Sequence, residues 1–319
     1  LPELCSIITK NLHETYNLQY DPKKEVIITL GVSQGLDLAL RSIVNPDDEV
    51  IIFEPCYVSY TANVSLLYAK PVVIANKSEN NFNIDIEEFK KAITDKTKAV
   101  ILNYPSNPTG ATIDKNTLEE ITKLAIKHNF IVISDEIYSE ITYGQKHVSI
   151  ASLKEMKDRT IILNGFSKSH AMTGWRVGYI AGPEEIISVA LKIHQYTALC
   201  ASSMGQYAAI EALKKGQSAV QKMNKEYERR KNFIVNRFNE IGLRCPEIKG
   251  AFYVFPDVSK TGLTGREFAL RLLEQEKVAV VPGEAFGEAS SYNIRCSYAT
   301  SMENLKEALF RIERFVNSL

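Results

Sequence analysis

The sequence lacks the features that mark several specialised classes of protein. Lys plus Arg and Asp plus Glu both number 38, so the formal net charge is zero and no overall field favours nucleic acid or an anionic membrane. The five cysteines form no CxxC pair and no zinc spacing, which is typical of reduced thiols. No apolar run approaches the roughly 18 residues of a membrane span, and no signal peptide is visible. We therefore expect a cytoplasmic protein without a nucleic-acid or membrane partner.

What the chain does contain is enough apolar sequence for a large core. It has 319 residues, of which 45% are hydrophobic, and this length favours two domains. It begins at Leu1 rather than at an initiator methionine, so we expect further elements upstream. No internal repeat, low-complexity tract or long linker interrupts the sequence.

Apolar runs alternate with helical patterns over the first two thirds of the chain, which predicts an α/β fold with a mostly parallel sheet. A first helix is expected at 1–19, and a turn at 31–35 opens a second. A further helix follows residue 110, with Asp114 or Thr117 as its N-cap. Strands are expected at 25–30, 48–55, 71–75, 99–103, 130–134, 160–163 and 177–181.

The last third of the chain has a different pattern. After helices at 184–196 and 203–214, the charged segment 218–241 predicts a long helix that links two domains. Short strands are expected at 250–255, 278–281 and 292–296, with helices at 264–276 and 302–317. We therefore predict a large domain over 1–220 and a small α+β domain over 221–319.

Polar or aromatic residues follow several of the predicted parallel strands, where α/β enzymes bind their ligands. The turn at 31–35 opens a helix whose first N–H groups suit an anion, although an ordinary βα turn has the same pattern. Tyr57 could stack on a planar cofactor or simply pack. Two prolines stiffen the turn that carries Asn107. Asp135 and Glu136 point to opposite sides of an extended chain, so at most one faces a site.

The segment 164–176 is the centre of the predicted site. It follows the apolar run at 160–163 and contains Lys168 and, eight positions later, Arg176. A lysine that can lose its proton, near an arginine suited to a phosphate, is what a pyridoxal-phosphate Schiff-base site needs.

Taken together, the motifs resemble those of class I and II pyridoxal-phosphate-dependent aminotransferases of fold type I, similar to aspartate and aromatic aminotransferases. The resemblance extends over nearly the whole chain. It implies a large, mostly parallel sheet domain with a smaller α+β domain at the C-terminus. The matching residues, in order, are 31–35, Tyr57, 106–110, 134–138, Ser167 and Lys168, 174–176 and 294–297.

The resemblance implies a role for each residue around the cofactor ring. Lys168 would carry pyridoxal 5'-phosphate as a Schiff base and then, once freed, move a proton from the substrate Cα. Asp135 would pair with the pyridine nitrogen. Asn107 and Tyr138 would hydrogen-bond the ring hydroxyl, and Tyr57 would stack on the ring.

The resemblance also implies where the anionic groups bind. The cofactor phosphate would contact the amides of Val32, Ser33 and Gln34, together with Arg176 and the Ser167 hydroxyl. The substrate α-carboxylate would be held by a two-point contact with Arg295 and by Asn107. An ion pair inside the small domain is the alternative reading of Arg295.

Two departures from the family pattern stand out. Many relatives have a serine three positions before the lysine, where this chain has Gly165. Relatives also begin tens of residues earlier, and that part supplies a glycine near the substrate carboxylate and a tyrosine that reaches the neighbouring subunit's phosphate.

The resemblance implies a homodimeric aminotransferase acting on an amino acid of aspartate, aromatic or N-acyl-diaminopimelate type and on a 2-oxo acid. A C–S β-lyase on the same scaffold is one alternative. The sensor half of an aminotransferase-like transcription regulator is another. Arg41 either meets a distal substrate carboxylate across the dimer or is an exposed helix arginine.

Overall fold

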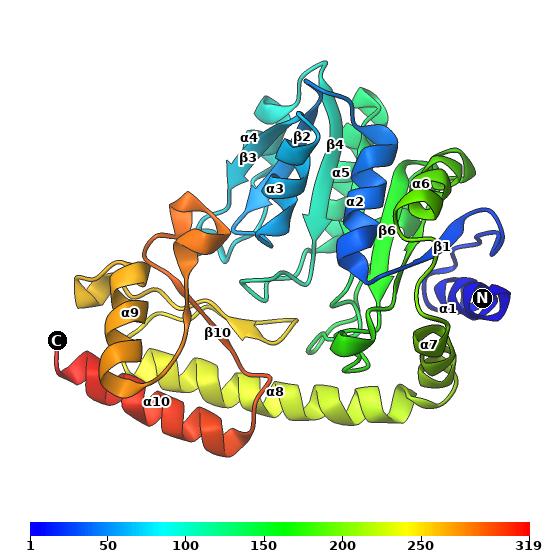
Figure 1. The fold of residues 1–319 in the computed structure, drawn as a ribbon. Coiled ribbons are helices and arrows are strands. Elements are labelled where there is room, and N and C mark those ends of the chain that lie inside the picture. The colour runs from blue at the N-terminus through cyan, green and yellow to red at the C-terminus, as the bar shows by residue number, and fades with distance from the viewer.

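A seven-stranded sheet forms the centre of the larger part of the molecule in the computed structural model, which describes residues 1–319 (Figure 1). The strand order is β1-β7-β6-β5-β4-β2-β3, and only β7 runs antiparallel to its neighbours. This arrangement confirms the predicted mostly parallel sheet. The strands are β1 (Val26–Thr29), β2 (Glu49–Glu54), β3 (Lys70–Ala75), β4 (Thr97–Asn103), β5 (Ile131–Asp135), β6 (Thr160–Gly165) and β7 (Gly178–Ala181).

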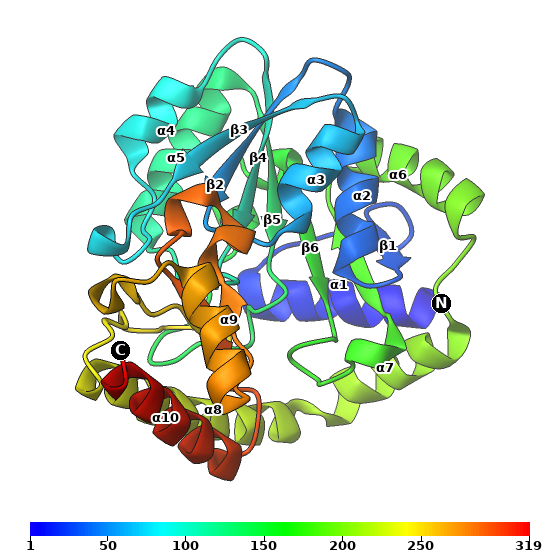
Figure 2. The same cartoon turned by 60° about the vertical axis from the view of Figure 1, so that its left-hand side comes forward.

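Helices cover both faces of this sheet (Figures 1 and 2). One face packs on α2 (Val32–Ile43), α3 (Ser59–Leu66) and α6 (Glu184–Thr197). The other face packs on α4 (Ile86–Ala92) and α5 (Lys115–His128), and near β1 and β7 on α1 (Pro2–Tyr16) and α7 (Ser203–Lys215). Because both faces are buried, the strands are continuous apolar runs, which is why the sequence revealed them so clearly.

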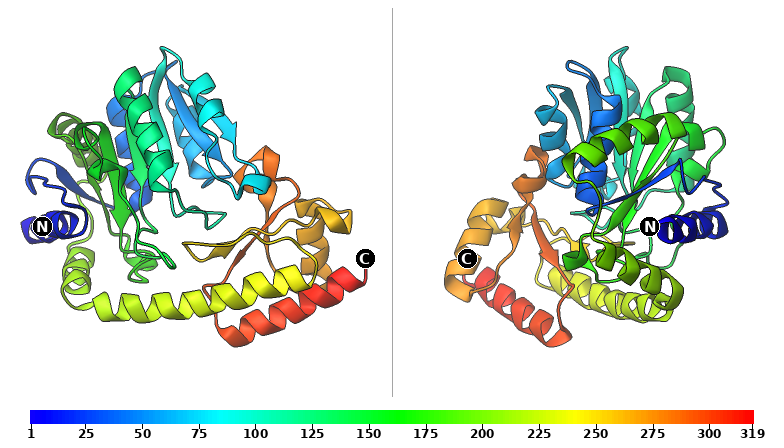
Figure 3. Two further views of the ribbon diagram at one scale, coloured as in Figure 1. Left: turned by 180° about the vertical axis from the view of Figure 1, so that it is seen from behind. Right: turned by 45° about the vertical axis from the view of Figure 1, so that its right-hand side comes forward.

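A three-stranded antiparallel sheet, in the order β8-β10-β9, forms the smaller part with α9 (Gly265–Glu276) and α10 (Met302–Asn317). The long helix α8 (Gln217–Glu240) runs along the lower side of both parts (Figure 3). Its first turn contains residue 220, so a continuous helix crosses the predicted domain boundary, and that division stays a prediction. The strands are β8 (Tyr253–Val254), β9 (Val281–Pro282) and β10 (Ile294–Ser297).

Some predicted element boundaries were wrong. Only the end of the strand expected at 278–281 pairs, because β9 is an edge strand bonded to β10 alone and Pro282 has no N–H to extend the ladder. The strand expected at 250–255 shortens to two residues. Helix α3 was not predicted, and α1 ends at Tyr16 where Asn17 adopts a left-handed conformation. Asp114, not Thr117, caps α5.

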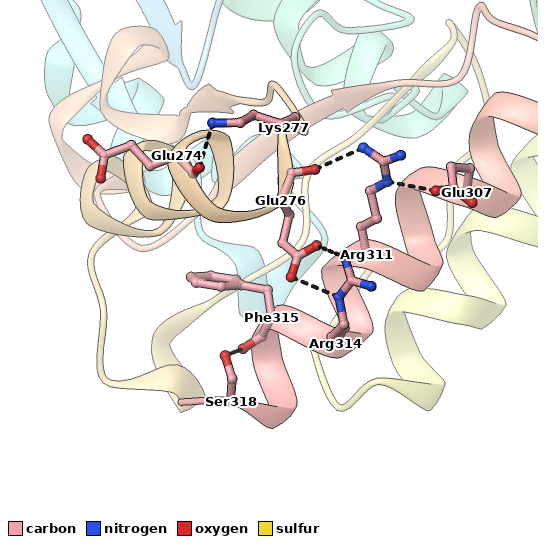
Figure 4. Close-up of polar contacts among 8 residues, drawn as sticks. All are labelled: Glu274, Glu276, Lys277, Glu307, Arg311, Arg314, Phe315 and Ser318. Atoms are coloured by element: carbon pink, nitrogen blue, oxygen red, sulfur yellow. Dashed lines mark hydrogen bonds and ion pairs between the residues drawn. The ribbon is translucent and has the colours of Figure 1, made fainter.

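The corner between α9 and α10 is held by paired charges (Figure 4). The Arg314 guanidinium donates to both carboxylate oxygens of Glu276, with Nε 3.0 Å from Oε1. Arg311 Nη1 donates to the backbone oxygen of Glu276 at 3.1 Å, and its Nε binds Glu307 at 2.7 Å. The last carbonyls of a helix lack partners within the helix and carry partial negative charge, so these cations stabilise the end of α9.

As for membranes, none of the helices combines the length and the apolar character that a membrane span requires.

Candidate active site

The predicted site residues meet at one edge of the large sheet, in a cavity of about 330 Å³. Strands β1, β2, β4, β5 and β6 point their carboxyl ends at this edge, which is where α/β folds place their ligands. The small sheet contributes the opposite wall. The lining residues are Val32, Ser33, Leu36, Tyr57, Tyr60, Asn103, Asn107, Asp135, Ile137, Tyr138, Ser167, Lys168, Thr173, Arg176, Tyr253 and Arg295.

One end of the cavity is built to receive an anion. Helix α2 begins directly after Gly31, and the amides of its first turn have no preceding helical turn to bind. Arg176 lies against the same turn, because a Cβ on Gly31 would sit 2.6 Å from Arg176 Nη2. The Arg176 guanidinium donates only to the backbone oxygens of Thr173 (3.0 Å) and Leu30 (3.4 Å), and no carboxylate balances its charge.

The glycines at this end permit close backbone packing. Gly31 has φ +77°, a conformation that favours glycine. Gly178, at the start of β7, lies so near that a Cβ would be 2.8 Å from the carbonyl carbon of Gly31 and 2.9 Å from the amide nitrogen of Val32. The side chain of Gln34 turns back to accept from the Leu30 amide at 2.9 Å, so only its backbone belongs to the anion end.

A buried carboxylate lies at the floor of the cavity. Asp135, the last residue of β5, is 4% exposed. Its Oδ2 accepts from the Tyr60 hydroxyl at 2.7 Å and its Oδ1 from the Ile137 amide at 3.2 Å. Burial raises the pKa of Asp135 to about 6, against the opposing effect of those two donors. Its neighbour Glu136 faces away from the cavity and binds two serine hydroxyls, as the alternation along a strand requires.

Lys168 enters the same cavity from the loop after β6. Burial, followed by the charges of Arg176 and Arg295, lowers the pKa of its amine. No carboxylate forms a salt bridge with it; Asp135 acts on it only as a weaker, opposing charge. This lysine therefore loses its proton more readily than an exposed lysine does, as a nucleophilic or basic amine must.

Arg295, from β10, is the third cation at the cavity, after Arg176 and Lys168. Its guanidinium carbon lies 4.6 Å from the ring centres of both Tyr253 and Phe286. Nη1 donates to Asn107 Oδ1 at 2.8 Å, while the buried Nε has no partner. The alternative reading, an ion pair in the small domain, is wrong, because no carboxylate pairs with this arginine. A flat, fixed guanidinium whose charge no carboxylate neutralises suits a carboxylate ligand.

The structure brings every predicted site residue to the cavity except Gln34, which does not line it and whose side chain accepts from the Leu30 amide instead. Sequence reasoning missed two apolar residues of the lining, Leu36 and Ile137, and four polar ones: Tyr60, Asn103, Thr173 and Tyr253. Asn103 is the last residue of β4, and that position was the available signal; its side chain bridges the Asp135 carbonyl and the Asn107 amide, both at 3.1 Å. Arg41 pairs with Asp37 on its own helix at 2.8 Å.

The donor set fits pyridoxal phosphate. A helix start with an unbalanced arginine matches a phosphate, a buried carboxylate matches a ring nitrogen, and a lysine of lowered pKa matches an aldehyde. The Arg295 guanidinium, which lines the cavity and forms no ion pair, matches a substrate carboxylate. Gly165 shows why the expected serine is absent: a Cβ there would lie 2.9 Å from the Gly178 Cα.

Comparisons with known proteins agree with this fit. The sequence model described as "Aminotransferase class I and II" matches residues 1–312. The chain is 50% identical over 310 residues to YugH, a putative aminotransferase of Bacillus subtilis (strain 168), a match covering 97% of this chain and 80% of the relative. It is 46% identical over 317 residues to an aspartate aminotransferase of Pyrococcus abyssi (strain GE5 / Orsay), covering 98% and 82%.

Comparison with solved structures also finds an aminotransferase. The crystal structure of an aromatic aminotransferase from Pyrococcus horikoshii OT3 matches with a TM-score of 0.97 and 44% identity, covering 100% of this chain and 86% of that chain. The fold and the cavity together define a pyridoxal-phosphate enzyme of fold type I. More narrowly, the chain belongs to the class I and II aminotransferases, and its activity is pyridoxal-phosphate-dependent amino transfer.

Proposed function

We propose that the protein moves an amino group from an aspartate, aromatic or N-acyl-diaminopimelate-type amino acid to a 2-oxo acid. The names of its relatives support these substrate classes. The observation that carries the residue roles is the convergence of Lys168, Arg176 and Arg295 on a cavity with Asp135 as its single carboxylate. When bound, pyridoxal phosphate supplies a conjugated ring that accepts electrons from the substrate Cα.

The anion end of the cavity would hold the cofactor phosphate. The amides of Val32, Ser33 and Gln34 present the positive end of α2, and Arg176 adds a full charge with no carboxylate partner. The Ser167 side chain, which lines the cavity beside Lys168, offers a hydroxyl donor in place of the serine that Gly165 replaces.

Lys168 would hold the cofactor covalently through its ε-amine and afterwards act as the base. A basic group works best when its pKa lies near the working pH, and burial with two neighbouring guanidinium groups moves Lys168 in that direction. The amine would then take the proton from the substrate Cα and return it to the cofactor carbon that receives the amino group.

The remaining residues would fix the ring. Asp135 would keep a proton at the ring nitrogen, because a buried carboxylate with donors on both oxygens makes a strong fixed acceptor. Asn107 and Tyr138 would donate to the ring hydroxyl, and Tyr57 would cover one ring face.

Arg295 would bind the substrate α-carboxylate. The two aromatic rings hold its guanidinium plane, and Asn107 fixes one end at Nη1. A carboxylate can then accept two parallel N–H groups, a geometry that a lysine cannot reproduce.

A substrate panel tests this proposal. Purified protein with pyridoxal phosphate is supplied with single amino donors and 2-oxoglutarate, and the new amino and 2-oxo acids are measured by chromatography. We expect transfer from at least one of the three donor classes. Pyruvate released from L-cystathionine without any 2-oxo acid, and no transfer in the panel, would favour the β-lyase instead.

The proposal includes a homodimer. Large apolar side chains are exposed where α6 meets α7: Tyr196 is 92% exposed, Leu199 78% and Met204 75%. Such a patch favours burial against a partner. Light scattering after gel filtration should give twice the chain mass of 35.8 kDa, and Leu199→Asp should shift the protein toward monomer. A monomeric parent protein would refute the dimer without affecting the chemistry.

A further inference from the structure

The roles proposed above do not include Tyr60, although its side chain contacts the Asp135 carboxylate. Tyr60, near the start of α3, is 2% exposed and packs in the core between α2, α3 and the large sheet. Its hydroxyl donates to Asp135 Oδ2 at 2.7 Å, across 75 positions of sequence. A charge-assisted hydrogen bond of this kind is among the strong ones in proteins.

This bond completes the fixation of the carboxylate. The terminal torsion of an aspartate is broad, so burial alone does not set the plane of its oxygens. Tyr60 holds Oδ2 and the Ile137 amide holds Oδ1. An ionised carboxylate offers about four lone-pair directions, so each oxygen keeps one free for a ligand N–H.

The same residue supports a second wall of the site. The rings of Tyr60 and Tyr57 meet edge to face, with centres 5.7 Å apart and planes at 83°, and the Tyr60 amide donates to the Tyr57 carbonyl at 3.0 Å. Tyr57 lines the cavity where the ring stack is proposed. Tyr60 therefore contacts both the partner of the ring nitrogen and the residue proposed to cover the ring.

The charge of Asp135 depends on its surroundings. Burial favours its neutral form, and the Glu136 carboxylate acts in the same sense. Tyr60 and the Ile137 amide favour the ionised form, as does Lys168 more weakly. Tyr138 also faces this carboxylate, as a neutral phenol whose pKa burial raises. Tyr60 is thus the principal side chain that opposes neutralisation.

We propose that Tyr60 is a positioning residue for amino transfer, which fixes the plane of the Asp135 carboxylate and keeps it ionised against the cofactor's ring nitrogen. This inference rests on the role proposed above for Asp135. Tyr60 does not itself exchange protons with the substrate; it acts through Asp135 and, by its ring, through Tyr57.

Tyr60→Phe tests the proposal, because it removes one oxygen atom and keeps the ring contacts. Tyr104→Phe is the matched control: Tyr104 is also a buried tyrosine near the same edge, but its hydroxyl only accepts a 3.4 Å bond from Asn76. The titration of Asp135 is followed in cofactor-free, aspartate-¹³C-labelled protein by NMR, with the Asp135 signal identified by its loss in Asp135→Asn.

We expect the Asp135 carboxyl to titrate near pH 6 in the parent and about one pH unit or more higher in Tyr60→Phe. Tyr104→Phe should match the parent. In the loaded enzyme, kcat should fall roughly tenfold in Tyr60→Phe alone. An unchanged Asp135 titration in Tyr60→Phe, or equal shifts in both variants, would overturn the proposal. The NMR result does not require catalysis, so an inactive parent would count against the proposed function and not against Tyr60.

Discussion

The α9–α10 corner and the active-site cavity both hold two arginines, in opposite electrostatic surroundings. In the corner, Arg314 meets the Glu276 carboxylate and Arg311 meets Glu307 (Figure 4). In the cavity, Arg176 meets only backbone carbonyls, and Arg295 meets an amide oxygen and two aromatic faces. The arginine charges in the corner are neutralised by carboxylates of the protein, whereas those in the cavity are neutralised only when anions bind.

This difference in charge pairing shows that some arginines of the chain contribute to stability and others to ligand binding. Paired charges near the surface contribute little and do no chemistry. Unbalanced charges in a cavity oppose folding, but they bind anions and shift the pKa values of their neighbours, as Arg176 and Arg295 do for Lys168. Substitutions in the two regions should therefore change different measured quantities.

Lys168→Ala should have the largest effect on activity. Proton transfer by a positioned base contributes about 10²- to 10⁴-fold, and this variant also removes the proposed covalent attachment, so we expect a loss of at least about a thousandfold. After borohydride reduction and denaturation, the cofactor should stay covalently attached to the parent and not to the variant. Covalent attachment in the variant would show that another amine holds the cofactor.

Asp135→Asn should have opposite effects on two quantities: it should lower the rate of amino transfer and raise the free energy of unfolding. The pKa of Asp135 rises from 3.8 to about 6 in the folded state, so its contribution to stability is complete below about pH 4 and is lost as the pH rises through 6. At pH 8 the ionised side chain opposes folding by up to about 3 kcal/mol.

Cofactor-free Asp135→Asn should accordingly resist urea better than the parent at pH 8, with the advantage shrinking toward pH 4. Its rate of amino transfer should fall about a hundredfold or more, because an amide does not hold the ring-nitrogen proton. A variant less stable than the parent at pH 8 would count against this electrostatic picture.

Arg295→Lys should have the next largest effect. Lysine keeps the charge and loses the planar two-point contact, so kcat/KM for the amino donor should fall roughly ten- to a hundredfold. Steady-state kinetics with several donor concentrations would measure this change. Equal kcat/KM in both proteins would indicate that the α-carboxylate binds elsewhere.

Arg314→Gln should have the smallest effect. The Arg314 side chain is 59% exposed, so solvent screens its pair with Glu276. Tm should therefore fall by a few degrees at most, and kcat/KM should not change. Thermal scans and kinetics on one preparation are sufficient. A clear loss of activity would show that the corner and the cavity are coupled.

The sequence predicted those parts of the site that follow from strand ends. Asp135 is the last residue of a buried parallel strand, and Asn107 and Lys168 come shortly after two others. Parallel strands bring their carboxyl ends to one edge. The order of the motifs then indicated the family, from which the roles of Arg176 and Arg295 were carried over.

Contacts between segments that are distant in the sequence could not be predicted from strand ends or motif order. Tyr60 reaches Asp135 from α3, a short helix whose apolar residues do not gather on one face, so no periodicity revealed it. The two rings around Arg295 come from separate elements: Tyr253 from β8 and Phe286 from the 3₁₀ helix Gly283–Phe286. The short strands β8 and β9 depend on tertiary pairing more than on local β-propensity.

One arginine from each region can be compared directly for its effect on cofactor binding. The dissociation constant of pyridoxal phosphate is measured by fluorescence titration of cofactor-free parent, Arg176→Gln and Arg314→Gln. We expect roughly tenfold or greater weakening in Arg176→Gln and parent-like binding in Arg314→Gln. Equal affinities in all three proteins would contradict the claim that the unbalanced charge in the cavity is kept for the cofactor.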